Sequence, residues 1–265
     1  MVIVVINNKG GTGKTTTSVN LSASIANLGH RVLLVDLDSQ ASASLSLGVR
    51  WNDLYPSIAD VLFQRTTLED TIRPSAIPNL DLATGEMELA NSDLILGAVP
   101  GRENRLSKCL ETVRHAYDYI LCDCPPSLSL LPINALVAAD FYIVPITAEY
   151  LALEGLISLM NAVGKAKKGM DLNPELLGIV FTMVNPILRS KSTKEVLRIV
   201  RGHYREKVFD TIIRRNISLT DAPSRGKSIF GFAPNSRGAR DYAGLADEVI
   251  KRCNSNSNLK QEEST

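Results

Sequence analysis

Six short apolar runs, separated by stretches of helical period, constrain the fold of this chain most strongly. The runs cover residues 2–6, 32–36, 80–84, 119–123, 141–146 and 176–183. Helical patterns cover 15–28, which Gly29 closes, and then 102–116, 151–168 and 237–252. This alternation predicts an α/β fold: a doubly wound, mostly parallel sheet with helices on both faces.

The length and composition favour one domain. The chain has 265 residues, of which 45% are hydrophobic and 22% charged, and this balance suits one large core. No Pro-, Gly- or Ser-rich linker and no repeat of 20 to 50 residues divides it. We therefore predict a single domain over 1–253. Residues 254–265 read NSNSNLKQEEST, which is polar and without period, and predict a disordered tail.

Three further features predict a cytoplasmic protein. The longest apolar runs are far shorter than the roughly 20 residues of a membrane span. No basic leader precedes the first apolar run. The four cysteines, Cys109, Cys122, Cys124 and Cys253, form neither a disulfide framework nor a structural zinc pattern. We expect them to be reduced and buried.

Positive charge is concentrated in one part of the chain. Residues 186–240 contain thirteen Lys or Arg and four Asp or Glu, a net +9, whereas the whole chain has a net charge of +1. This asymmetry favours a polyanionic partner over the alternative of solvated helix faces.

A glycine-rich segment follows the first predicted strand and opens the first predicted helix. It reads Lys9-Gly10-Gly11-Thr12-Gly13-Lys14-Thr15-Thr16. In such a loop the backbone N–H groups point at phosphate oxygens, and the helix N-terminus adds partial positive charge. Lys14 can reach the outer phosphates and Thr15 can ligate Mg²⁺. The segment predicts a triphosphate-binding loop.

The loop departs from the usual phosphate-loop pattern at two positions. The pattern has Gly where this chain has Asn8, and it requires no lysine at the position of Lys9. Because Lys14 already serves the phosphates, Lys9 needs an explanation of its own.

Carboxylates follow two of the predicted strands, at the edge where sheets of this kind bind ligands. Asp36 and Asp38 lie at the end of the second run, and Asp123 ends the run 119–123. Asp123 suits the hydration shell of Mg²⁺, and Asp38, further out, can orient or deprotonate an attacking water. For Asp36 a helix-capping or structural role is equally consistent with the pattern.

Five segments together match one family over about residues 2–250: Lys9–Thr16, Asp38–Gln40, Asp123–Ser127, Glu149–Gly155 and Ala222–Lys227. The chain thereby resembles the ParA/Soj family of partition ATPases. That family lies within the deviant Walker-A group, which includes MinD and the nitrogenase iron protein. The loop marks the larger group, whereas the last two segments point to ParA/Soj. The resemblance implies a P-loop fold and hydrolysis of ATP with Mg²⁺.

The resemblance also assigns roles. Lys9 matches a lysine that reaches the partner's nucleotide across an ATP-sandwich homodimer. The hydrolytic aspartate falls on Asp38, the phosphate-loop lysine on Lys14 and the Mg²⁺-ligating hydroxyl on Thr15. Asp123, with Asp38, falls on the carboxylates that hold the metal's water shell.

The resemblance also assigns the adenine and DNA contacts, although this sequence differs from the family's pattern at one position in each set. The family's Ile-Pro-Arg-Asn segment is Ile213-Arg214-Arg215-Asn216 here. Backbone contacts to adenine therefore fall near Arg214 and Asn216, with Asn185 as a competing candidate. A DNA-contacting arginine of relatives is Ser218 here. The side chains left for DNA are Arg189, Lys191, Arg214, Arg215, Arg225 and Lys227.

The resemblance implies an ATP-dependent switch on the nucleoid. ATP promotes dimerisation, the dimer binds double-stranded DNA without sequence preference, and an adaptor protein stimulates slow hydrolysis. The cargo is a plasmid, a chromosome region or an organelle, since carboxysome-positioning relatives such as McdA share the architecture.

Two alternatives use the same scaffold. A MinD-like membrane role needs an amphipathic C-terminal helix, but 254–265 has neither an apolar stripe nor a basic cluster. A metabolic or redox role like that of the iron protein would use Cys122 and Cys124 as cluster ligands. Because they flank Asp123 on one strand, we expect packing instead.

Overall fold

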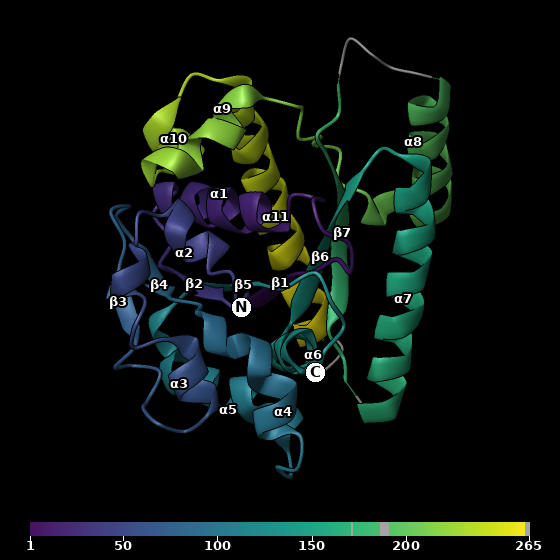
Figure 1. Cartoon of the computed structure of the whole chain (residues 1–265). Coiled ribbons are helices and arrows are strands. Elements are labelled where there is room, and N and C mark those ends of the chain that lie inside the picture. The colour runs from purple at the N-terminus through teal and green to yellow at the C-terminus, as the bar shows by residue number, and fades with distance from the viewer. Residues whose placement is uncertain (171, 186–190, 263–265) are drawn as a thin grey trace.

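The computed structural model describes residues 1–170, 172–185 and 191–262, and these are built around one seven-stranded sheet (Figure 1). The strand order is β3-β4-β2-β5-β1-β6-β7, and every pairing is parallel except that of β3 with β4. The strands are β1 (Val2–Val5), β2 (Val32–Asp36), β3 (Ile72–Pro74), β4 (Leu80–Ala83), β5 (Tyr119–Asp123), β6 (Phe141–Thr147) and β7 (Glu175–Thr182). The predicted mostly parallel α/β sheet is confirmed.

Six of these strands coincide with the six apolar runs, and β3 is the addition. It is only three residues long, reads Ile-Arg-Pro, and is partly exposed at the antiparallel edge of the sheet. An edge strand needs no continuous apolar run, and proline is tolerated there. The apolar pattern could therefore not reveal it.

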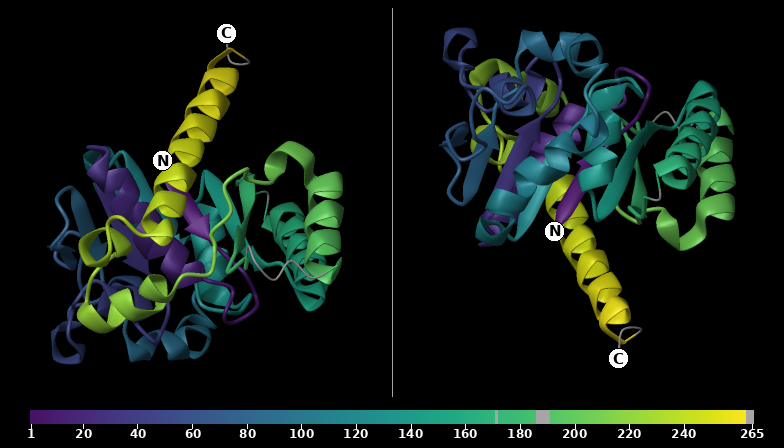
Figure 2. Two further views of the ribbon diagram at one scale, coloured as in Figure 1. Left: turned by 90° about the horizontal axis from the view of Figure 1, so that it is seen from above. Right: turned by 90° about the horizontal axis from the view of Figure 1, so that it is seen from below.

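Helices cover both faces of the sheet (Figures 1 and 2). They are α1 (Lys14–Asn27), α2 (Ser42–Ser46), α3 (Ile58–Leu62), α4 (Ser92–Leu96), α5 (Arg105–Val113), α6 (Leu130–Ala138), α7 (Tyr150–Met170), α8 (Lys191–Tyr204), α9 (Ile217–Asp221), α10 (Ile229–Phe232) and α11 (Arg237–Glu262). Helices α1, α2, α9, α10 and α11 share one buried cluster with the sheet, and α3, α5, α6, α7 and α8 share the other.

The pleat of the strands divides the core between these two clusters. Val2 and Val4 belong to the cluster with α5 to α8, whereas Ile3 between them belongs to the cluster with α1 and α11. All of these side chains are buried. Burial on both faces explains why the runs are apolar without alternation.

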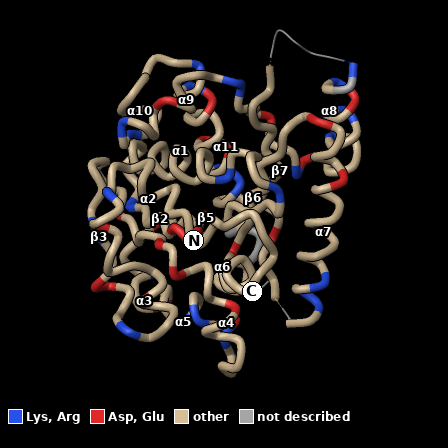
Figure 3. The backbone as a smooth tube through the Cα atoms, viewed as in Figure 1, with Lys and Arg blue, Asp and Glu red and all other residues tan. Residues whose placement is uncertain are grey.

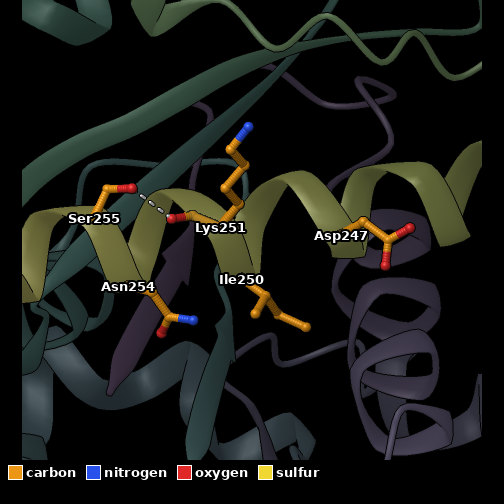
Figure 4. A pocket seen from close by; sticks show the side chains of 5 residues that line it. All are labelled: Asp247, Ile250, Lys251, Asn254 and Ser255. Atoms are coloured by element: carbon orange, nitrogen blue, oxygen red, sulfur yellow. Dashed lines mark hydrogen bonds between the residues drawn. The ribbon is translucent and has the colours of Figure 1, made fainter.

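The C-terminal region differs from the sequence prediction. Helix α11 continues to Glu262, so residues 254–262 are helical rather than a disordered tail, and 263–265 lie outside the described residues. Polar side chains accompany this extension: the Ser255 hydroxyl donates to the Lys251 carbonyl (3.0 Å, Figure 4) and the Asn256 amide to that of Arg252 (3.0 Å). The end of the helix projects beyond the body of the molecule (Figure 2).

None of the described helices combines the length and the apolarity that a membrane span requires.

Candidate nucleotide site

The glycine-rich loop connects β1 to α1 at the carboxyl edge of the sheet. Gly11 and Gly13 have φ values of +72° and +82°, a region that favours glycine. The loop is tied to β7, because the Thr182 hydroxyl donates to the Thr12 carbonyl (2.8 Å). The chain thus supplies the backbone that the sequence predicts for a phosphate cradle, with Lys14 as the first residue of α1.

The side chain of Lys14 bends back over this loop. Its Nζ donates to the Lys9 carbonyl (2.9 Å), and the residue is buried. Burial lowers the pKa of Lys14, while the nearby Asp123 carboxylate opposes that change. A phosphate bound in the cradle would favour the charged form of this amine.

Lys9 points elsewhere. Its Nζ donates to the carbonyl of Leu151 in the first turn of α7. The side chain lies against Gly155, where an added Cβ would come within 2.5 Å of the Lys9 Cε. The two lysines of the loop are therefore separated: Lys14 covers the cradle and Lys9 leaves it.

Asp123 joins the end of β5 to α1. Its carboxylate accepts hydrogen bonds from the Thr15 and Ser18 hydroxyls, both at 2.8 Å. Ser18 is not among the residues predicted from the sequence, although its place about one helical turn after Thr15 was a usable signal. Thr15, the predicted metal ligand, and Asp123, the predicted carboxylate of the water shell, are thus in direct contact.

Asp36 and Asp38 have different surroundings. Asp36 is buried and accepts hydrogen bonds from the backbone N–H and hydroxyl of Ser44 (2.8 and 2.7 Å) and from the Asp38 N–H (3.2 Å). It therefore fixes the start of α2 and the segment that carries Asp38. The Asp38 side chain is only partly buried and accepts from the Gln40 N–H (3.0 Å).

Buried negative charge dominates the electrostatics of this edge. Asp36 pairs in register with Asp123 on the neighbouring strand, and both carboxyls are buried. Burial raises the pKa of both groups, and for Asp123 the charge of Asp36 adds to the increase. Oxygen ligands of this kind suit Mg²⁺, and a divalent cation beside them would favour their ionised forms. The residues present therefore fit a magnesium ion.

A cavity of about 660 Å³ opens beside the loop, lined by Gly13 and Thr16 at one end. The residues assigned to adenine, Asn185, Arg214 and Asn216, line it too, together with Thr193 of α8. Asn216 also caps α9, since its side-chain oxygen accepts from the Ser218 N–H (2.9 Å). The cavity joins the phosphate cradle to every adenine candidate.

The predicted DNA-contacting residues are not equivalent. Arg214 forms an ion pair with Asp241 (2.5 Å), so its charge is already neutralised and its role as a DNA contact is disfavoured. Lys191, Arg215, Arg225 and Lys227 are exposed. Arg189 lies outside the described residues.

Cys122 and Cys124 are both fully buried in the cluster that packs against α5 to α8. Burial raises the pKa of the Cys122 thiol to about 12. Within the described ranges, no group of three or more His, Cys, Asp or Glu side chains is arranged to hold a metal ion by itself.

Comparison with known proteins agrees with this geometry. A family model described as an AAA domain matches residues 1–177. The sporulation initiation inhibitor protein Soj of Bacillus subtilis (strain 168) is 43% identical over 248 residues, which are 94% of this chain and 97% of Soj. The chromosome partitioning protein ParA of Myxococcus xanthus (strain DK1622) is 37% identical over 251 residues, 95% of this chain and 88% of ParA.

A solved structure extends the comparison to bound ligands. Cobyrinic acid a,c-diamide synthase from Mycobacterium smegmatis, with bound ADP and magnesium, superposes with a TM-score of 0.83 at 30% identity, covering 96% of each chain. The sequence matches cover nearly the whole chain. The chain therefore belongs to the Soj/ParA family of partition ATPases, P-loop enzymes that hydrolyse ATP with Mg²⁺.

Proposed function

We propose that this partition ATPase is a nucleotide-gated switch. ATP joins two copies into a sandwich dimer, the dimer binds double-stranded DNA of any sequence on the nucleoid, and an adaptor protein stimulates hydrolysis and release. The cycle segregates or positions a cargo, which is a plasmid, a chromosome region or an organelle.

This proposal rests on the different positions of the two lysines in the phosphate loop. Lys14 alone covers the phosphate cradle, whereas the Lys9 amine lies outside it on α7. Because Lys14 already covers the cradle, the second cation at its rim is better placed to contact the nucleotide bound to another copy of the chain. The surface beside it supports this use, since Tyr150 and Leu151 are each 64% exposed. Exposed apolar side chains around a functional loop are typical of an interface.

The residues of one protomer then have separate tasks in hydrolysis. The loop N–H groups and Lys14 bind the phosphates, and Thr15 with Asp123 would hold Mg²⁺. When bound, the metal neutralises charge on the phosphates. Asp38, partly exposed beyond the end of β2, orients the attacking water and accepts its proton.

The basic segment supports DNA as the partner of the dimer. Residues 186–240 have a net charge of +9, and of the predicted contacts Lys191, Arg215, Arg225 and Lys227 are exposed. Side chains of this kind contact phosphates rather than bases, so we expect binding without sequence preference.

Sedimentation of wild type and Lys9→Ala tests the proposal. With ATP and Mg²⁺ the wild type should form a dimer, whereas Lys9→Ala should bind ATP with unchanged affinity and stay monomeric. Lys108→Ala, which removes an exposed cation from α5, is the matched control and should dimerise as the wild type does. Equal dimerisation of Lys9→Ala and wild type would overturn the use of Lys9 in the partner's site.

A further inference from the structure

Helix α8 carries a regular row of cations, which we call the α8 stripe. Its members are Lys191, Lys194, Arg198 and Arg201. The successive spacings are three, four and three residues. At 3.6 residues per turn these side chains fall within an arc of about 80° on one side of the helix. Figure 3 marks Lys and Arg along α8.

The α8 stripe faces solvent. Val196 and Val200 are buried and anchor the opposite side of the helix in the core, whereas all four cations are exposed. None of the four forms an ion pair with another residue in the described part of the chain. The stripe is therefore an uncompensated row of positive charge.

This arrangement is unlike an ordinary solvated helix face. Like charges at i,i+3 and i,i+4 destabilise a helix, and solvated faces usually mix both signs to avoid this. Here the negative side chain of Glu195 lies beside the stripe and not within it. A polyanion laid along the helix would remove the repulsion.

The stripe also has the length and chemistry of a phosphate-contacting surface. From Lys191 to Arg201 it extends for about 15 Å at 1.5 Å per residue, which corresponds to about four base pairs of duplex DNA. It contains only Lys and Arg, without the Asn, Gln or aromatic side chains that read or stack on bases. Such a surface follows a backbone and ignores sequence.

We infer that the α8 stripe is a DNA-contacting surface, extending the path of the duplex from the nucleotide edge along the outside of α8. This inference rests on the DNA binding proposed above. Thr193, in the first turn of α8, lines the nucleotide cavity, so the stripe begins next to that cavity. In a sandwich dimer each protomer would then present its own stripe.

The test compares two triple variants in titrations of random-sequence duplex DNA with ATP over a series of salt concentrations. Lys194→Gln, Arg198→Gln and Arg201→Gln together remove three charges from the stripe. Arg31→Gln, Arg102→Gln and Lys108→Gln remove three exposed charges from other elements and serve as the matched control. ATP-dependent dimerisation is measured for both and should not change.

We expect the stripe variant to lower the slope of log K against log salt by about 2.7, or about 0.9 per lost phosphate contact, for each protomer engaged. Its affinity at low salt should fall at least tenfold. The control should keep the wild-type slope, and Glu195→Gln on the same helix should strengthen binding. If the triple variant failed to dimerise, Arg201→Gln alone should still lower the slope by about 0.9.

A stripe variant, triple or single, with the slope and affinity of the wild type would overturn the inference alone. A wild-type dimer without salt-sensitive affinity for DNA would overturn the proposed function as well.

Discussion

At the scale of single residues, the chemistry of the loop was predictable because it follows from residue type and order. Glycines, Lys14 and Thr15 directly after a strand can hardly serve anything but phosphate and metal. The partners of long side chains were not predictable, since they come from distant parts of the chain. Arg214 pairs with Asp241, and Lys9 reaches Leu151. Only the fold brings these pairs together.

Asp38→Ala and Lys14→Ala should separate hydrolysis from binding. The Asp38 carboxylate accepts a hydrogen bond from the Gln40 N–H and not from the phosphate loop, so its removal should leave ATP affinity within about twofold while turnover falls by about 10²-fold or more. Lys14→Ala should lose nucleotide binding itself. Isothermal titration and single-turnover hydrolysis measure the two effects. Equal loss of affinity and turnover in Asp38→Ala would show that Asp38 has a structural role.

The buried carboxylates predict a pH dependence of the nucleotide-free protein. The pKa of Asp123 is raised to about 7 and that of Asp36 to about 6, so the folded state holds their protons more tightly than the unfolded state. The contribution of these two carboxyl groups to the free energy of unfolding must then decrease as the pH rises from about 4 to 7. We expect the Tm of wild type relative to Asp123→Asn to fall between pH 5 and pH 8. A relative Tm that rises over this interval contradicts the assignment.

At the scale of elements, strands buried on both faces were predictable and unpacked elements were not. Residues 32–36 and 119–123 give strands with the predicted bounds, because only a central strand tolerates such apolar runs. The edge strand β3 lacks that signal. It forms with little burial, so hydrophobic periodicity does not report it.

One close contact between two segments of the chain can be tested through its effect on the free energy of unfolding. An added Cβ at Gly226 would lie 2.6 Å from the Cα of Gly48, and Gly226 has a φ of +61°. Gly226→Ala should therefore lower the free energy of unfolding by about 1–3 kcal/mol.

The matched control is Gly202→Ala in α8, where no described heavy atom beyond the adjacent residues and the backbone of the helix itself lies within 4 Å of the new Cβ. This substitution should stabilise the helix by up to about 1 kcal/mol. Urea unfolding measures both variants, and a Gly226→Ala protein as stable as wild type would refute the contact.

At the scale of the whole molecule, the architecture brings ATP binding and positive charge to one region. The nucleotide cavity lies at the carboxyl edge of the sheet, and its wall includes Thr193, at the start of the α8 stripe. The sequence predicted the basic segment as a block of residues. It could not predict the row along one side of α8, because α8 was not recognised as a helix and its buried face was therefore unknown.

Titration of random-sequence duplex DNA with ATP, with ADP and without nucleotide tests the central claim most directly. A dimer doubles the number of phosphate contacts, so binding with ATP should be much tighter and have a steeper salt dependence than binding under the other two conditions. Lys9→Ala should bind DNA weakly under all three. Equal affinity with ATP, with ADP and without nucleotide would contradict a nucleotide-gated DNA switch.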